Sequence, residues 1–117
     1  MILFDRIADY ENLDTVIKSK DKRGLIQGFV KPYGSNRQAK DENFFQENRI
    51  TLSTIKGAKG HDAYLVFLLG ADLFGTDRND RASFYVGTTR AKMGLVITGV
   101  LTENNLLDEA LKLVDIL

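Results

Sequence analysis

The chain has 117 residues, the size of one domain or of a part of one. Hydrophobic residues make up 44% of it and charged residues 27%, which is enough apolar material for a core and excludes wholesale disorder. The 16 basic and 16 acidic residues give a formal net charge of zero. Any nucleic-acid contact must therefore be local or shared with another part of a larger protein, because a free-standing nucleic-acid-binding domain is usually basic.

Several kinds of site are excluded by residue type alone. The chain has no cysteine, so it has no disulfide, no cysteine-based zinc site and no cysteine nucleophile. Its one histidine, His61, cannot build a histidine-rich metal site. No apolar run approaches the roughly 20 residues that span a bilayer, and the first six residues do not resemble a signal peptide. We expect a cytoplasmic α/β chain without a metal site.

Residues 1–48 match no motif that we can name, and we assign them to the same domain as the rest of the chain. A helix is predicted over residues 5–19. Its apolar positions recur at helical spacing and are Ile7, Leu13, Val16 and Ile17. Leu25 to Val30 is typical of a strand, and the polar residues 34–48 favour a long exposed loop.

The chain changes character from Arg49 onward. Ile50 to Thr54 is a predicted strand, and the glycine-rich segment Lys56 to Gly60 is a predicted turn. Tyr64 to Leu69 is apolar without alternation, which is typical of a strand buried on both faces of a parallel sheet. A loop is expected over residues 70–80.

The last third favours helix, strand and helix. A helix is predicted over residues 81–92 and is expected to end at Gly94. Leu95 to Val100 has the composition of a second buried strand. Asn104 or Asn105 is placed to cap a final helix. The apolar stripe of that helix is Leu106, Leu107, Ala110, Leu111 and Val114.

This order of elements predicts an α/β fold with a mainly parallel sheet flanked by helices. Ligands of such sheets bind at the carboxyl ends of the strands. We therefore expect the segment after Thr54 and the end of the 81–92 helix to lie at that edge.

Two segments resemble motifs of a known family. Residues 50–70 read ITLSTIKGAKGHDAYLVFLLG and resemble motif V of the UvrD/Rep-like superfamily 1 helicases, which runs roughly T-x-H-x-A-K-G-L-E-F into an apolar strand. Residues 81–99 read RASFYVGTTRAKMGLVITG and resemble motif VI of the same family. The two motifs occur in the family's order and together cover about a third of the chain.

The resemblance implies a partial RecA-like (2A) domain of the P-loop NTPase type, with its helicase core at residues 49–117. In this family ATP and Mg²⁺ bind between this domain and an N-terminal RecA-like domain of the same protein, and the motor moves along single-stranded DNA. Arg90 matches the arginine that reaches the γ-phosphate. Its guanidinium is always charged and offers a planar fork of donors, which suits phosphoryl transfer.

The resemblance also assigns residues to the nucleotide. Gly60, His61 and Asp62 stand where the family has Gly-Leu-Glu, whose glutamate contacts the sugar. Asp62 keeps the carboxylate on a side chain that is one methylene shorter. Gly60 is expected to supply a turn conformation closed to other residues, and Gly87 to let the backbone approach a ligand. His61 is expected to be an exposed, solvated imidazole.

Three residues are assigned to the nucleic acid by the same resemblance. Thr54 matches the threonine that approaches the nucleic-acid backbone, and Lys59 belongs to the family's Lys-Gly core. Lys56 replaces the family's histidine, so it can contact a phosphate as a point charge but cannot stack. The alternative for both lysines is a solvated turn.

Catalysis by this chain alone is not expected. The sequence contains no Gly-x-x-x-x-Gly-Lys-Ser/Thr loop for the phosphates and no strand ending in Asp-Glu for Mg²⁺. We therefore interpret the chain as a fragment of an ATP-dependent DNA helicase or translocase.

Two alternatives remain open at this point. One is a stand-alone module that binds a protein or nucleic acid without catalysis; a phosphate-binding loop encoded upstream in the same reading frame would exclude it. The other is the superfamily 1 branch that includes RNA helicases, whose motif V commonly has Gln-Gly where this chain has Lys59 and Gly60.

Overall fold

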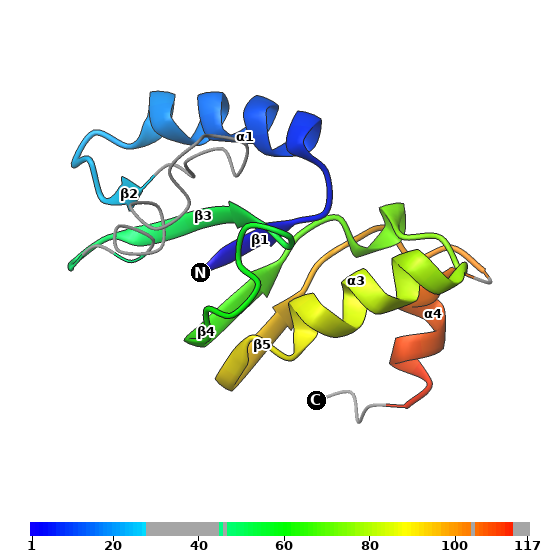
Figure 1. Ribbon diagram of the computed structural model, residues 1–117. Coiled ribbons are helices and arrows are strands. Elements are labelled where there is room, and N and C mark those ends of the chain that lie inside the picture. Colours follow the sequence, from blue (N-terminus) through cyan, green and yellow to red (C-terminus); the bar gives the residue numbers. More distant parts are fainter. Residues whose placement is uncertain (28–44, 46, 104, 114–117) are drawn as a thin grey trace, which may run out of the picture.

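The computed structural model describes residues 1–27, 45, 47–103 and 105–113. In this part of the chain, five strands, parallel in every adjacent pair, form one sheet in the order β2-β3-β1-β4-β5. The strands are β1 (Ile2–Phe4), β2 (Ile26–Gln27), β3 (Ile50–Thr54), β4 (Ala63–Leu68) and β5 (Ala91–Ile97). The helices of the described ranges are α1 (Ile7–Lys20), the 3₁₀ turn η1 (Ala71–Leu73), α3 (Arg78–Thr88) and α4 (Leu106–Leu111). The predicted α/β class, with a parallel sheet flanked by helices, is confirmed (Figure 1).

The central strand β1 was not among the elements expected from the sequence. Ile2 pairs with Leu52 of β3 on one side and with Phe67 of β4 on the other. Leu3 and Phe4 are buried. Three residues are too few to reveal a period, so only pairing with distant strands identifies this segment as the middle of the sheet.

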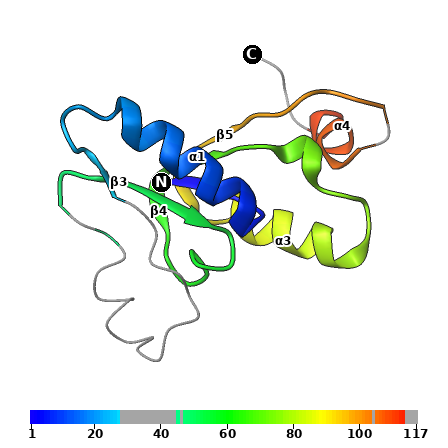
Figure 2. The same ribbon diagram turned by 90° about the horizontal axis from the view of Figure 1, so that it is seen from above.

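The helices cover opposite faces of the sheet. Leu3 packs in a cluster with Val66 of β4 and Phe84 of α3, whereas Phe4 packs with Leu52 and with Leu13 of α1. Successive residues of a strand point to opposite faces, so α1 and α3 lie on different sides. Figures 1 and 2 show α1 over the β1–β3 part of the sheet and α3 on the other side.

The predictions for the first half hold where the structure describes it. The helix predicted over residues 5–19 is α1, and β2 is the described part of the strand predicted from Leu25 to Val30. Most of the loop predicted over residues 34–48 lies outside the described residues, as do Asn104 and Val114.

The helix predicted over residues 81–92 is displaced. It starts at Arg78 because the Asp77 side chain caps it, accepting a hydrogen bond from the Asp80 N–H at 2.9 Å. It ends at Thr88, and Ala91 already pairs with Ala63 at the start of β5. Gly94 therefore lies inside a strand rather than at the end of a helix, because hydrogen bonding to β4 overrides local helix propensity.

The prediction that residues 64–69 and 95–100 are buried on both faces is only partly right. Val66 and Leu68 are fully buried, but Tyr64 and Val100 are 70% and 67% exposed. Leu95 also remains exposed. The reason is topology, since β5 is an edge strand and α1 covers the opposite half of the sheet.

The final helix confirms one of the two expected caps. The Asn105 side chain accepts a hydrogen bond from the Asp108 N–H at 2.8 Å, and α4 begins at the next residue. Leu106 and Leu107 are buried as predicted. None of the helices in the described ranges is long and apolar enough to cross a membrane.

Candidate functional site

The turn of residues 55–60 follows β3 and carries four of the predicted site residues on or beside it. Its backbone is anchored to the sheet, because the Ile55 N–H donates to the Phe4 carbonyl at 2.8 Å. Ile55 and Ala58 are buried. The turn is therefore a fixed support for the side chains that it exposes.

Thr54 stabilises this turn through hydrogen bonds to its backbone. Its side chain is only 2% exposed, and its Oγ1 accepts a hydrogen bond from the Gly57 N–H at 3.1 Å. Its carbonyl accepts another from the Ala58 N–H at 3.0 Å. Thr54, predicted to approach nucleic acid, is placed by the structure at the base of the turn, where it supports Lys56.

Lys56, Lys59 and Gly60 lie exposed on the same turn. Gly60 has a φ of 86°, which confirms the special turn conformation predicted for it. A Cβ added at Gly60 would meet no atom within 4 Å, so the requirement there is conformational and not steric.

His61 is less solvated than predicted. It is half-buried, and its ring meets the Phe45 ring edge-on with centroids 5.9 Å apart. Its backbone N–H donates to the Ala58 carbonyl at 2.9 Å. The expectation of an exposed, solvated imidazole is wrong, because Phe45 packs against the ring and comes from a distant segment whose approach no local pattern reveals.

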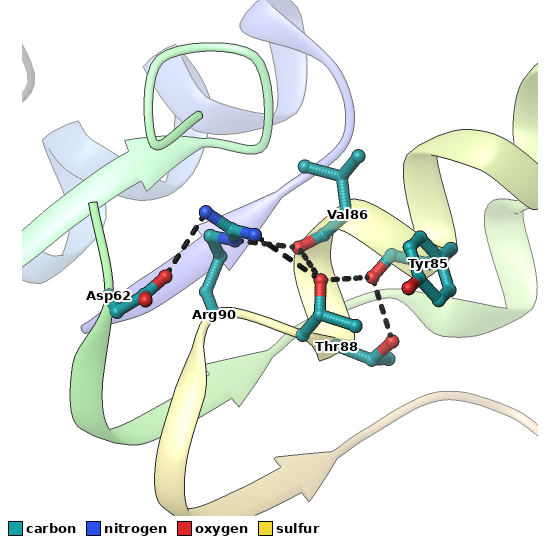
Figure 3. A network of polar contacts seen from close by, with 6 residues as sticks. Asp62, Tyr85, Val86, Thr88 and Arg90 are labelled. Carbon is teal, nitrogen blue, oxygen red and sulfur yellow. Dashed lines mark hydrogen bonds and ion pairs between the residues drawn. The ribbon is translucent and has the colours of Figure 1, made fainter. Parts of the chain in front are cut away.

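Arg90 and Asp62 form the charged centre of the site. Nη1 of Arg90 lies 3.1 Å from Oδ1 of Asp62, with the two side chains 21% and 45% exposed. Nε of Arg90 donates to the Val86 carbonyl at 3.1 Å, and Nη2 donates to Oγ1 of Thr89 at 3.4 Å. Figure 3 shows the guanidinium between the end of α3 and the start of β4. The resemblance implied neither the ion pair with Asp62 nor the contact with the Val86 carbonyl. Every residue has a backbone carbonyl, so the sequence cannot show which one accepts a hydrogen bond.

This centre lies at the amino edge of the sheet, contrary to the expectation that the end of the 81–92 helix would reach the carboxyl edge. Arg90 occupies the turn between α3 and β5, and its carbonyl accepts from the Ala63 N–H at 2.9 Å, where β4 begins. The helix α3 joins two parallel strands, so it must run back across the sheet and end where β5 starts. Thr54, in contrast, ends β3 at the carboxyl edge.

Gly87 connects the two motif segments by close packing. It is buried, and a Cβ built on it would lie 3.1 Å from Cδ1 of Ile55 and 3.4 Å from Cδ1 of Leu68. The nearest neighbours of Gly87 are thus Ile55 and β4. This packing places the turn that carries Lys56 against the helix that leads to Arg90.

The donor set suits an anion better than a cation. Among the described residues, no group of three His, Asp or Glu side chains could hold a metal ion. The Arg90 guanidinium has five N–H donors, more than its contacts with Asp62, Val86 and Thr89 use. The remaining donors can bind phosphate oxygens in the paired geometry that these oxygens accept. The Arg90 guanidinium therefore has the donor chemistry to bind phosphate oxygens.

Comparison with protein families agrees with the two motifs. Residues 49–98 match the UvrD-like helicase C-terminal domain. Comparisons with curated proteins and with solved structures gave no match. The matched range contains the anchored turn, α3 and the Arg90–Asp62 pair. Residues 49–98 of this chain are therefore similar to the UvrD-like helicase C-terminal domain.

Proposed function

We propose that this helicase fragment is the second motor domain of an ATP-dependent DNA helicase or translocase, and that Arg90 is its arginine finger. The observation that supports this most directly is the position of Arg90, partly exposed at the sheet edge and oriented by the Val86 carbonyl. An oriented guanidinium can donate two hydrogen bonds to the oxygens of a γ-phosphate as charge develops on them.

In this proposal the nucleotide is ATP with Mg²⁺, bound jointly with an N-terminal RecA-like domain of the same cytoplasmic protein. The missing domain would supply the phosphate-binding loop and the Mg²⁺ ligands, since residues 1–117 contain no sequence motif for either. Arg90 would contact the γ-phosphate and Asp62 the nucleotide. Gly60 and Gly87 would serve the nucleotide side indirectly, by shaping the turn before Asp62 and by bringing α3 onto that turn.

Single-stranded DNA is proposed to bind along the exposed side of the 55–60 turn. Lys56 and Lys59 would contact phosphates there, and Thr54 would hold the turn in place. Because Ile55 packs on Gly87, a shift of the DNA-bound turn would be felt by the helix that ends next to Arg90. This contact is the physical basis that we propose for coupling between the strand and the ATP state.

The test is replacement of Arg90 by alanine in the complete motor. We expect ATP turnover to fall at least about a hundredfold, with ATP affinity largely spared, because an arginine finger acts mainly in the transition state. Arg81→Ala is the matched control, since Arg81 lies on α3 but pairs with Glu109 of α4. Near-normal turnover by Arg90→Ala would refute the finger assignment.

A further inference from the structure

Among the described residues, the guanidinium of Arg90 has three partners of two different kinds. The Val86 carbonyl and the Thr89 hydroxyl are neutral acceptors at the end of α3. The third partner, Asp62, is a carboxylate on the residue just before β4. A guanidinium has five N–H donors, so these contacts orient it and still leave donors for an anion.

The two kinds of partner affect an incoming anion in opposite ways. The neutral acceptors fix the direction of the guanidinium without cancelling its charge. The Asp62 carboxylate, 3.1 Å from Nη1, offsets that charge and would repel a phosphate approaching the same group. The Asp62 carboxylate and an incoming phosphate therefore compete for the positive charge of Arg90.

The side chains differ in how readily they can separate. Arg90 is 21% exposed and tied to the helix end, whereas Asp62 is 45% exposed. Asp62 also follows Gly60, whose positive φ ends the turn, and precedes the first residue of β4. The carboxylate is thus the partner that can turn into solvent while Arg90 stays in place.

We propose that Asp62, in addition to the nucleotide contact proposed above, positions Arg90 and controls the access of phosphate to it. In the closed pair it holds the guanidinium and weakens its attraction for anions; an anion binds fully only when Asp62 turns away. This regulation rests on the proposed function, because it concerns the same arginine. It makes anion binding at Arg90 depend on displacement of the Asp62 carboxylate.

The test measures binding of sodium tripolyphosphate to the 117-residue chain by titration calorimetry at low salt. Asp62→Asn keeps the size of the side chain and removes its charge, so we expect affinity to rise about three- to tenfold. Arg90→Ala should remove this gain when combined with Asp62→Asn. Asp62→Glu keeps the negative charge, so its affinity for tripolyphosphate should stay close to that of the unaltered chain.

A matched control removes a carboxylate from a different ion pair. Asp108 pairs with Lys112 within one turn at 3.1 Å, on the helix that contacts the first turns of α3 rather than its end. Asp108→Asn should therefore leave tripolyphosphate affinity unchanged. Circular dichroism checks folding, and Asp62→Ser carries the same test if Asp62→Asn does not fold.

A second readout distinguishes positioning from a merely structural role. The Nε–H signal of Arg90 in ¹⁵N-resolved NMR reports its bond to the Val86 carbonyl. Asp62→Asn and added tripolyphosphate should each shift this signal, and the shift caused by tripolyphosphate should be reached at a lower concentration in the variant.

The outcomes separate this inference from the proposed function. Equal or weaker tripolyphosphate binding by Asp62→Asn overturns the control of access and leaves the finger assignment intact. A gain that survives in the Asp62→Asn, Arg90→Ala double variant also overturns it, because the effect would then be a general change in charge. Normal ATP turnover by Arg90→Ala in the complete motor counts against the proposed function instead.

Discussion

Gly87 of α3 lies against Ile55 of the β3–β4 turn so closely that a Cβ at position 87 would approach Cδ1 of Ile55 to 3.1 Å. The contact joins the segment that carries Lys56 to the segment that carries Arg90, and both lie in the family-matched range. A closely packed interior has little free volume, so a displacement of one of these residues is transmitted to the other. A substitution at Gly87 or Ile55 should therefore perturb both halves of the site.

Replacing Gly87 by alanine should lower the free energy of unfolding. Overpacking against Ile55 and Leu68 costs about 1 to 3 kcal/mol, and the gain in helix propensity offsets about 1 kcal/mol of it, so we expect a net loss of up to about 2 kcal/mol. Urea unfolding measures it. Ile55→Val removes the clashing Cδ1 methyl group. The Gly87→Ala, Ile55→Val double variant should therefore lose less stability than the sum of the losses in the two single variants. A more stable Gly87→Ala chain would contradict the close packing.

Gly60→Ala should destabilise the chain for a different reason. The φ of 86° at Gly60 strains any residue with a Cβ, although no neighbouring atom would be touched. We expect a loss of about 1 to 2 kcal/mol in urea unfolding. Gly60→Asn should cost less, because asparagine tolerates positive φ better than alanine. Equal stability of the alanine and asparagine variants would argue against a purely conformational role.

Glu109 should make the stability of the chain depend on acid pH. The Arg81 guanidinium donates two hydrogen bonds to its carboxylate, at 2.7 and 2.9 Å, and together with its charge lowers the pKa of Glu109 below the ordinary 4.5. A lowered folded-state pKa stabilises the fold above the unfolded-state pKa, and this contribution is lost as the pH falls through the folded-state value.

Thermal unfolding across this acid range provides the measurement. The Tm of the unaltered chain should fall more steeply below pH 4.5 than that of Glu109→Gln, which cannot ionise. Both groups are exposed, so high salt should reduce the difference. Parallel Tm curves would mean that the Arg81–Glu109 pair contributes nothing to stability.

Lys56→Ala should weaken binding of single-stranded DNA and reduce its dependence on salt. Loss of one phosphate contact lowers the slope of log K against log salt by about 0.7. Fluorescence anisotropy with a labelled oligothymidine at several salt concentrations measures this slope. Lys112→Ala is the control, because Lys112 lies at the C-terminal end of α4 and pairs with Asp108. An unchanged slope would remove Lys56 from the proposed contacts.

Local sequence was sufficient for the features that depend on neighbours in the chain. The strand from Ile50 to Thr54, the glycine turn after it and the Asn105 cap all appear where they were predicted. Each is decided within a few residues, by β-branched side chains, by the φ that only glycine adopts readily, or by one side-chain hydrogen bond. The motif segments also pointed to the family that residues 49–98 match.

Only the tertiary structure decided the features that depend on distant partners. β1 is the middle strand because β3 and β4 pair with it, and α3 ends early because β5 pairs with β4. The ion pair of Arg90 with Asp62 arises where the end of a helix meets the start of a strand 28 positions earlier in the chain. Strand hydrogen bonds and ion pairs join residues far apart in sequence, so no local pattern of propensity or periodicity contains them.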